Sequence, residues 1–410
     1  MSPSPRAVAR AALRTIVALR TLVALRTLVA LVAVGLAADA SGQSARTVLI
    51  APTYQLWQFD KAVPLDSLRV IDASQISAPF VIALPFASRY SASVSGAAFT
   101  SRISTEGAAS GGASRSLSGV TDLRVRVTGP LIGDALQFTL GLNAPTGNRE
   151  LSLPENDVLR VLAAPALGAQ VAVPGVGLGG TIGLIAARLS GNWALALGAS
   201  VEHRGAYSPL DAVIIGRSAR TELAPGGAVH LSFGAEGQLG LHRLTIGVSG
   251  DMYASDEVRS ITSGGTQIDQ YRLGPTGLVT IALQVGGTGF RELTFRVTDR
   301  YRSAFSDASG GTIVGSNGNY FEGGLSGLLG PTDGVSVLLG LDARQHSGLP
   351  VDNGFIGAGL TAVGATIGLS IPTGGVEWRP TFRYSQGNLK TGRITTSMAS
   401  FTAGLSLSAR

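Results

Sequence analysis

The sequence predicts an all-β fold, a transmembrane antiparallel up-and-down β-barrel of about 14 strands, with 12 to 16 as the bounds. Three observations favour this fold class. Only 14% of the 410 residues are charged, against about 25% in ordinary soluble domains. Glycine is abundant, at 56 residues. From about residue 78 onward, large apolar residues alternate with small or polar ones at a period of two, which is the period of a β-strand.

The composition excludes several other classes. The chain has no cysteine, so it is neither a disulfide-stapled module nor a carrier of a cysteine-ligated zinc or iron–sulfur site. Most of the net charge of +6 comes from five arginines within residues 1–40. The remaining chain is nearly neutral, has two lysines (Lys61 and Lys390) and contains no basic run. It therefore lacks the charge needed to neutralise nucleic-acid phosphates.

Residues 1–40 are typical of a secretory signal peptide. Arginines precede the apolar stretch 27–38, and residues 38–40 (Ala-Asp-Ala) provide a small-residue cleavage site. We expect cleavage after Ala40, with Ala45 as the alternative. An uncleaved helical anchor is the competing interpretation, but arginines interrupt the apolar run and leave about 12 residues, too few to cross roughly 30 Å of hydrocarbon. Export from the cytoplasm follows.

Two stretches are harder to interpret. Residues 41–78 do not alternate cleanly, and two alternatives remain: one more strand with its turn, or a plug inside a barrel formed by 79–410. Residues 161–187 are uncharged but contain six glycines and two prolines, which a helix interior does not absorb cheaply. We interpret this run as two strands joined by a turn at 174–180.

The alternation is clear on individual segments. In 136–143, Leu136, Phe138, Leu140 and Leu142 share one face. Segments bounded by turn residues predict sixteen candidate strands, each about as long as a tilted strand across a bilayer, roughly 9 to 11 residues: 80–87, 90–100, 119–128, 134–143, 158–169, 177–188, 192–203, 226–236, 240–251, 271–285, 291–302, 319–329, 335–345, 355–370, 376–386 and 397–408. Nothing there repeats at helical spacing.

The connections between these segments also favour a membrane barrel. Some are tight turns, whereas 102–118, 204–223, 252–268 and 303–316 are long and polar. Short turns on one rim and long loops on the other are typical of outer-membrane barrels. A soluble β-sandwich is the alternative, but its wet face normally carries many charges. Here that face is mostly Gly, Ala, Ser and Thr, as expected for the crowded inner wall of a closed sheet.

Charged residues recur on this small-residue face, so we expect them to line the lumen. The candidates are Arg124, Arg126, Glu202, Glu236, Arg296, Arg300, Arg302, Glu322, Asp342, Arg344, Glu377, Arg379 and Arg383. Two interpretations remain open. The charges bridge one another as mutually satisfied pairs, or the arginines set a field along a channel that favours anions or polar solutes.

Catalytic chemistry has few candidates among four histidines and no cysteine. His230 and Ser232 lie two residues apart on the inner face of one strand, and a His and Ser in contact make a nucleophile when a third group orients them. A barrel lipid hydrolase would need this pair to face lipid, and no orienting partner is evident. We therefore expect an ordinary pair of lumen side chains, no catalytic residue, no cofactor and no metal.

The segment Asp122 to Gly147 resembles a known family. Its matching points are Gly119, Asp122, the strand ending at Leu142, and Pro145-Thr146-Gly147, the last echoed by Pro372-Thr373-Gly374. They resemble outer-membrane barrels of the phenol-degradation meta-pathway family and, more loosely, the long-chain fatty-acid transporter family. The resemblance implies a monomeric barrel that passes hydrophobic or aromatic compounds across the outer membrane.

We therefore expect a passive channel or transporter for small, hydrophobic or aromatic molecules in a Gram-negative-type outer membrane. Its partners would be outer-membrane lipid, the barrel-assembly machinery and a small-molecule solute, with no nucleic acid and a monomer favoured. The alternative is a structural or surface-binding barrel that acts through its long loops, and the lipid hydrolase is third.

Overall fold

A computed structural model describes residues 47–409 except 66–67, 88, 107–112, 134, 148–149, 174, 215–216, 263–264, 287–290, 308–312, 315–316, 332–333, 349–358 and 392–393. The expected signal peptide, residues 1–40, lies outside the described residues.

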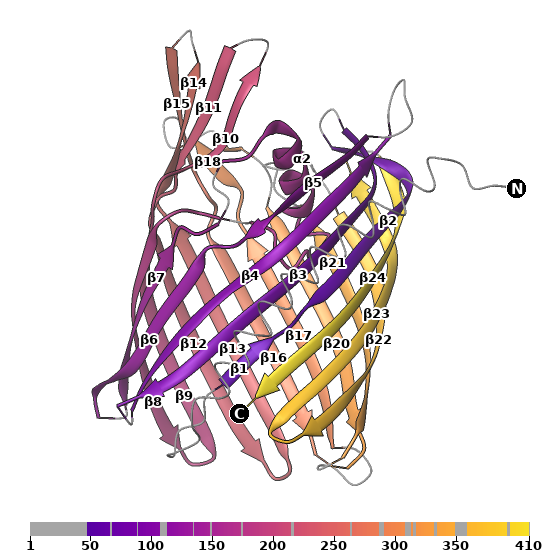
Figure 1. The fold of residues 1–410 in the computed structure, drawn as a ribbon. Helices are drawn as coiled ribbons and strands as arrows, with labels where there is room; N and C mark the ends of the chain where they lie inside the picture. Colours follow the sequence, from indigo (N-terminus) through magenta and orange to yellow (C-terminus); the bar gives the residue numbers. More distant parts are fainter. Residues whose placement is uncertain are drawn as a thin grey trace, which may run out of the picture.

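Eighteen strands of the described chain form one closed antiparallel sheet (Figure 1). We call each traverse of the wall a stave. Two staves consist of two strands each, β1 with β2 and β5 with β6, so the barrel has sixteen staves. The strands are β1 (Thr47–Ile50), β2 (Thr53–Leu65), β3 (Leu68–Phe86), β4 (Tyr90–Thr105), β5 (Ala113–Val120), β6 (Leu123–Ile132), β7 (Leu136–Ala144), β8 (Gly179–Ser190), β9 (Trp193–Arg204), β12 (Ala228–Leu239), β13 (His242–Tyr253), β16 (Thr276–Val285), β17 (Glu292–Arg302), β20 (Gly318–Leu329), β21 (Ser336–Ser347), β22 (Gly359–Thr373), β23 (Val376–Thr391) and β24 (Ile394–Ala409).

The barrel closes where its first and last staves meet. β24 pairs with β23 on one side and with both β1 and β2 on the other, with Ile50 opposite Leu407 and Trp57 opposite Ser400. Closure leaves no free sheet edge, so the backbone groups of the wall are paired with one another.

The outer face of the wall is apolar. The side-chain period of two places large residues outward on successive strands, and many of them are exposed. Examples on β7 to β16 are Leu140, Leu142, Ile182, Leu184, Leu197, Val201, Phe233, Val248, Val279 and Ile281. Such a band suits contact with acyl chains, and the fold is therefore that of a transmembrane barrel.

The two rims differ as predicted. The lower rim in Figure 1 carries tight turns, such as Gly374-Gly375 between β22 and β23, where both residues have positive φ (57° and 84°). Glycine adopts this conformation without the steric cost that a Cβ would bring. The long connections emerge from the upper rim.

Three of the expected polar loops contain strands instead. Residues 204–223, 252–268 and 303–316 contribute to a second sheet of six described strands: β10 (Tyr207–Ile214), β11 (Arg217–Ala224), β14 (Ser255–Thr262), β15 (Gly265–Arg272), β18 (Phe305–Asp307) and β19 (Ile313–Val314). This upper sheet stands above the barrel in Figure 1. The hairpins hydrogen-bond to one another, through β11 with β14 and β15 with β18. The residue pattern within any single loop does not predict this pairing between loops.

The expected strand count of about 14 is too low, and two segments explain the difference from the list of sixteen. Residues 158–169 are not a strand: they include the end of helix α2 (Leu153–Leu162) and an irregular stretch, and the turn expected at 174–180 joins no hairpin, since β8 pairs directly with β7 and β9. The missing stave is β1 and β2, at 47–65. Its large residues take the outer face at Tyr54 and Leu56 and the inner face at Trp57, Phe59 and Val63, so the period of two changes phase within the strand and is hidden. A plug and a strand remained open for residues 41–78. Of these, the described strands at 47–50, 53–65 and 68–78 form wall, and 41–46 lie outside the described residues.

A polar cluster attaches the upper sheet to the barrel. The buried Asp256 carboxylate accepts the Gly226 N–H at 2.6 Å and lies 3.4 Å from Arg204, whose guanidinium also donates to the Gly226 carbonyl. Arg204 lies over the Tyr253 ring, 5.6 Å from its centroid. Burial raises the pKa of the Asp256 carboxyl, although the Gly226 N–H and the charge of Arg204 oppose this shift.

This shift predicts a pH dependence of the upper sheet. A carboxyl whose pKa is raised by folding stabilises the folded form below its unfolded pKa of about 3.9, and this stabilisation is lost as the pH rises through the folded pKa. We expect hydrogen-exchange protection of the β14 amides to fall over that interval, and Asp256→Asn to abolish the fall. Asp269→Asn, on the exposed β15, is the control. An unchanged pH profile in Asp256→Asn would contradict the prediction.

The orientation of the wall predicts different effects for two substitutions on β9 and β13, the staves on either side of β12. Leu197 on β9 points outward and is 63% exposed, so Leu197→Arg places a charge against lipid and should lower the free energy of unfolding by roughly 2–4 kcal/mol. Gly247 on β13 points inward, and an added Cβ there meets nothing within 4 Å. We expect Gly247→Arg to be nearly neutral. Urea unfolding in lipid vesicles measures both, and equal losses would rule out this orientation.

Candidate functional site

The lumen is narrowed by a segment that folds inward between β7 and β8. It begins with α2, where Ser152 donates its backbone N–H to the Glu155 carboxylate at 2.9 Å and Pro154 occupies the first turn. This is the capping pattern of a helix N-terminus. Val158, Val161 and Leu162 are buried on the face of α2 that packs against β4 and β5. We call residues 150–178 the inserted segment.

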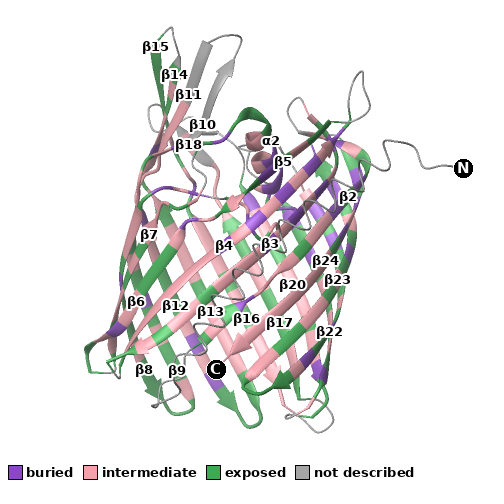
Figure 2. Ribbon diagram, in the orientation of Figure 1, coloured by how far each residue is buried: buried purple, intermediate pink, exposed green. Residues whose placement is uncertain are grey.

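The upper half of the inner wall is apolar where the inserted segment covers it. Figure 2 shows buried residues gathered in the upper part of β2, β3 and β4. One continuous core joins the segment to seven staves of the wall, through the buried residues Trp57, Phe59, Val63, Val70, Ala73, Ala97, Phe99, Ile103, Leu117, Leu360, Ala362, Leu389 and Met398. The expectation of a uniformly small and polar inner face is therefore wrong in this half.

Side chains of β2 and β3 bind the backbone of the irregular part of the inserted segment. Gln75 donates to the Val171 carbonyl at 2.8 Å and accepts the Val171 N–H at 2.9 Å. Trp57 Nε1 donates to the Leu167 carbonyl at 2.9 Å, and Gln55 accepts the Gln170 N–H at 2.9 Å. Backbone without a sheet or helix partner is costly to bury. These side chains therefore replace the missing secondary structure and hold the segment against the wall.

Asp122 joins the two ends of the inserted segment. It lies in the break between β5 and β6 and is 5% exposed. Its Oδ1 accepts the Gly147 N–H at 2.8 Å, and its Oδ2 accepts the Val176 N–H at 2.7 Å and the Asn143 amide at 3.0 Å. The residues that carried the family resemblance, Asp122 and Gly147 among them, thus form a clasp at the point where the chain leaves and re-enters the wall.

Five of the expected lumen charges lie in one region beneath the inserted segment. Arg383 donates two hydrogen bonds to Asp342, at 2.9 and 2.5 Å. Glu322 accepts the Tyr320 hydroxyl. Arg344, directly opposite Glu322 in the register, is buried, and its contact with Ser385 is long, at 3.4 Å. Arg300 is the register partner of Tyr320 on the next stave.

A second cluster lies across the barrel on β9, β12 and β13. His230 contacts two carboxylates: Asp251 at 2.7 Å through Nδ1 and Glu202 at 3.1 Å through Nε2. Asp251 also accepts the Thr276 hydroxyl at 2.6 Å. Both ring nitrogens of His230 are therefore occupied by carboxylates, and no hydrogen bond joins His230 to Ser232, both of which are described. This is not the arrangement of an activated serine.

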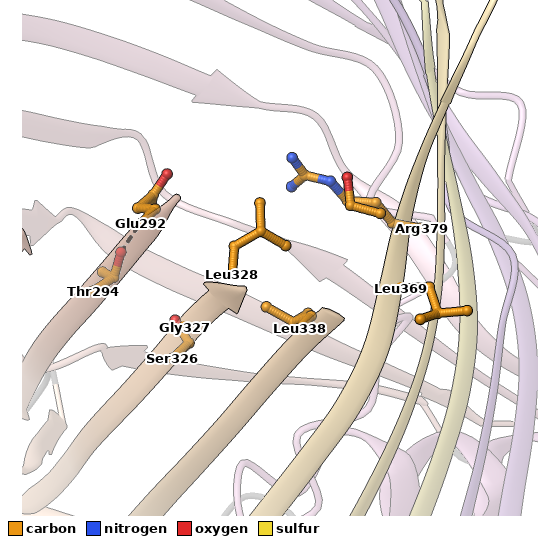
Figure 3. Close-up of a pocket in the computed structure, with 9 residues that line it drawn as sticks. Glu292, Thr294, Ser326, Gly327, Leu328, Leu338, Leu369 and Arg379 are labelled. Atoms are coloured by element: carbon orange, nitrogen blue, oxygen red, sulfur yellow. Dashed lines mark hydrogen bonds between the residues drawn. The ribbon is translucent and has the colours of Figure 1, made fainter. Parts of the chain in front are cut away.

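Three of the other expected lumen residues belong to two ion pairs in the lower half of the inner face. Glu236 pairs with Arg243 at 2.5 Å, and Glu377 pairs with Arg379 at 2.8 Å. Arg124, Arg126 and Arg296 are exposed on β6 and β17, and Arg126 shares a register row with Glu202. Arg302 is half-buried at the upper end of β17. A small cavity of about 160 Å³ opens between Glu292 and Arg379, with Leu328 between them (Figure 3).

The inserted segment and the residues that hold it were missed at the level of sequence. One signal could have found the helix: Ser152-x-x-Glu155 with Pro154 is a capping pattern. The clasp at Asp122 and the glutamines at 55 and 75 have no such local signal, because their partners lie 25 to 115 residues away in the chain.

These features define a class: a transmembrane β-barrel with a partly filled lumen. Within the described residues, no helix is long and apolar enough to cross a membrane, and no group of His, Asp and Glu has the geometry of a metal site.

No family model and no curated protein matches the chain. Its fold is similar to solved structures of outer-membrane channels. The TodX ΔS2 mutant, a monoaromatic hydrocarbon channel, is 10% identical over 90% of this chain and 91% of that chain, with a TM-score of 0.43. An outer-membrane channel from Pseudomonas putida F1 is 16% identical over 66% and 92%, with a TM-score of 0.35. OccAB4 of Acinetobacter baumannii is 8% identical over 90% and 99%, with a TM-score of 0.40.

The hydrogen bonds of the clasp predict that loss of the Asp122 carboxylate frees the inserted segment and widens the lumen. Asp122→Ala removes the acceptor for both ends of the inserted segment, so we expect a larger single-channel conductance in planar bilayers and faster proteolysis within 150–173. Asp122→Asn keeps one acceptor oxygen, so its conductance and its proteolysis rate should lie between those of the unmodified chain and those of Asp122→Ala. Asp269→Ala, on the upper sheet, is the control. A conductance of Asp122→Ala equal to that of the unmodified chain would show that the clasp does not hold the segment.

Proposed function

We propose that the protein is a passive channel of an outer membrane that admits small hydrophobic or aromatic molecules. The observation that carries the proposal is the apolar core inside the upper lumen, where Trp57, Phe99, Ile103, Leu360 and Leu389 meet the inserted segment. A water-filled pore has a polar interior. An apolar solute, by contrast, makes contacts equivalent to those of the inserted segment as it passes along these side chains.

The mechanism is diffusion down a gradient in two stages. The solute leaves water for the apolar half of the lumen, where removal of its apolar surface from water is favourable by roughly 25 cal/mol per Å². It then enters the lower half, whose exposed charged residues restore contact with water. No bond changes in this mechanism, and no cofactor enters it. We further propose that residues 1–40 direct export, that the assembly machinery inserts the barrel, and that the monomer is the working unit.

The upper sheet supports a second candidate function, a barrel that binds partners at the surface. β10, β11, β14 and β15 extend beyond the rim and expose Ile261 and Ile268. Removal of these hairpins should then abolish surface binding and leave solute uptake unchanged. The lipid hydrolase is the weakest candidate, since the described His230 is engaged by two carboxylates on the inner face.

Solute uptake tests the channel directly. We expect a lipopolysaccharide-bearing host that expresses the chain to take up labelled toluene several-fold faster than the same host with an empty vector. Glucose, which cannot use apolar contacts, should show a much smaller increase. Lipopolysaccharide is needed because toluene crosses simple lipid bilayers unaided. Equal toluene uptake in the two hosts would overturn the proposed function.

A further inference from the structure

The basic cluster beneath the inserted segment contains a guanidinium that the described carboxylates do not satisfy. Arg344 is 8% exposed, its Nε has no hydrogen-bond partner among the described residues, and its Nη2 makes only a long contact of 3.4 Å with Ser385 among those residues. The neighbouring carboxylates are engaged elsewhere, Asp342 by Arg383 and Glu322 by Tyr320. A buried guanidinium left in this state is costly.

His346 lies beside Arg344 in the same condition. It is 2% exposed, and neither ring nitrogen has a partner among the described residues. Its ring meets the Tyr320 ring edge-on, with centroids 4.1 Å apart. The two side chains point to the same face of β21, two residues apart, so their unsatisfied nitrogens face one region of the lumen.

The charge balance of the cluster favours an anion. Three arginines, Arg300, Arg344 and Arg383, face two carboxylates, Glu322 and Asp342, which leaves one positive charge in excess. A guanidinium has five donors in a planar fork that matches a carboxylate, and such hydrogen bonds are stronger than neutral ones.

The surroundings of the cluster favour an apolar body on that anion. Leu360 is the register partner of His346, and Leu389 is the partner of Leu360 on the next stave; both are fully buried. Gly168 of the inserted segment covers Arg344, and a Cβ at this glycine would lie 3.3 Å from Nη1. Its φ of +62° also favours glycine. The backbone of the inserted segment at Gly168 therefore occupies the space beside Arg344 that a small ligand would take.

From these observations we infer that Arg344 and His346 form a binding point for the carboxylate of a small organic acid whose apolar part packs on Leu360 and Leu389. The inference rests on the proposed function and narrows its solute class, from hydrophobic molecules in general to amphipathic acids. Arg344 binds the carboxylate through its fork, and His346 donates one hydrogen bond from a ring nitrogen.

Titration calorimetry on the detergent-solubilised full chain tests this inference, with benzoate as the probe and toluene as its uncharged counterpart. We expect benzoate to bind the unmodified chain and Arg344→Met to weaken it by about tenfold or more, the worth of a charged hydrogen bond. Toluene binding should not change. Arg344→Lys should retain part of the affinity, and His346→Leu should lose a few-fold. Arg379→Met, at the exposed lower pair with Glu377, is the control and should bind benzoate normally.

Folding of each variant is checked by heat-modifiable migration, and removal of an uncompensated buried charge should not impair it. Absence of benzoate binding to the unmodified chain overturns the inference, as does equal benzoate affinity in Arg344→Met. In either case toluene uptake by the expressing host is a separate readout, so the channel proposal stands or falls on its own. A tenfold loss confined to benzoate and to Arg344→Met supports the inference.

Discussion

The structure depends on one constraint: backbone donors and acceptors inside a membrane need partners from the protein itself. In the wall the constraint is met by closure, with β24 hydrogen-bonded to β1 and β2 at the seam. Closure fixes the two faces of each strand. Leu197 and Val248 point outward because the register places Gly234 and Gly247 on the opposite face. The apolar band and the small inner residues are consequences of the same pairing.

The same constraint explains how an irregular segment is tolerated inside the barrel. Residues 163–173 form neither helix nor strand, and yet they are largely buried. Gln55, Trp57 and Gln75 supply the donors and acceptors that a neighbouring strand would have supplied. Apolar contacts hold the remainder. A filling held by a few side-chain hydrogen bonds and one carboxylate clasp is weaker than a sheet, which suits an element that has to yield to a passing solute.

Electrostatics divides the inner wall into regions with different roles. Glu202, His230 and Asp251 satisfy one another on one side of the lumen. On the other side Arg383 is paired with Asp342, whereas the buried Arg344 has no carboxylate contact among the described residues. Paired charges stabilise the wall, and they attract a charged solute only weakly because each is neutralised by its partner. The unpaired guanidinium lies near the buried Leu360 and Leu389, and the inferred carboxylate-binding point rests on this combination.

The sequence by itself determined the fold class. The period of two, the low charge and the unequal connections required a membrane barrel, because each reports a local property: which face a residue takes and what solvent that face meets. Fifteen of the sixteen expected strands are staves of the wall for this reason. Two matching points of the family resemblance, Asp122 and Gly147, are hydrogen-bonded to each other, a contact that the resemblance did not predict.

The tertiary structure alone decided the closing stave, the inserted segment and the partners of the inner charges. Trp57 belongs to a segment for which a plug and a strand remained open, and Ile103 to an expected polar loop, but both face a core inside the lumen because residues 163–173 fold back against them. The run 161–169 is apolar and free of charge in either setting, so composition cannot distinguish a strand in lipid from a segment buried in a barrel. Which arginine is paired and which is not depends on the register between staves. That register is set by hydrogen bonds between residues far apart in the chain, and no local pattern contains it.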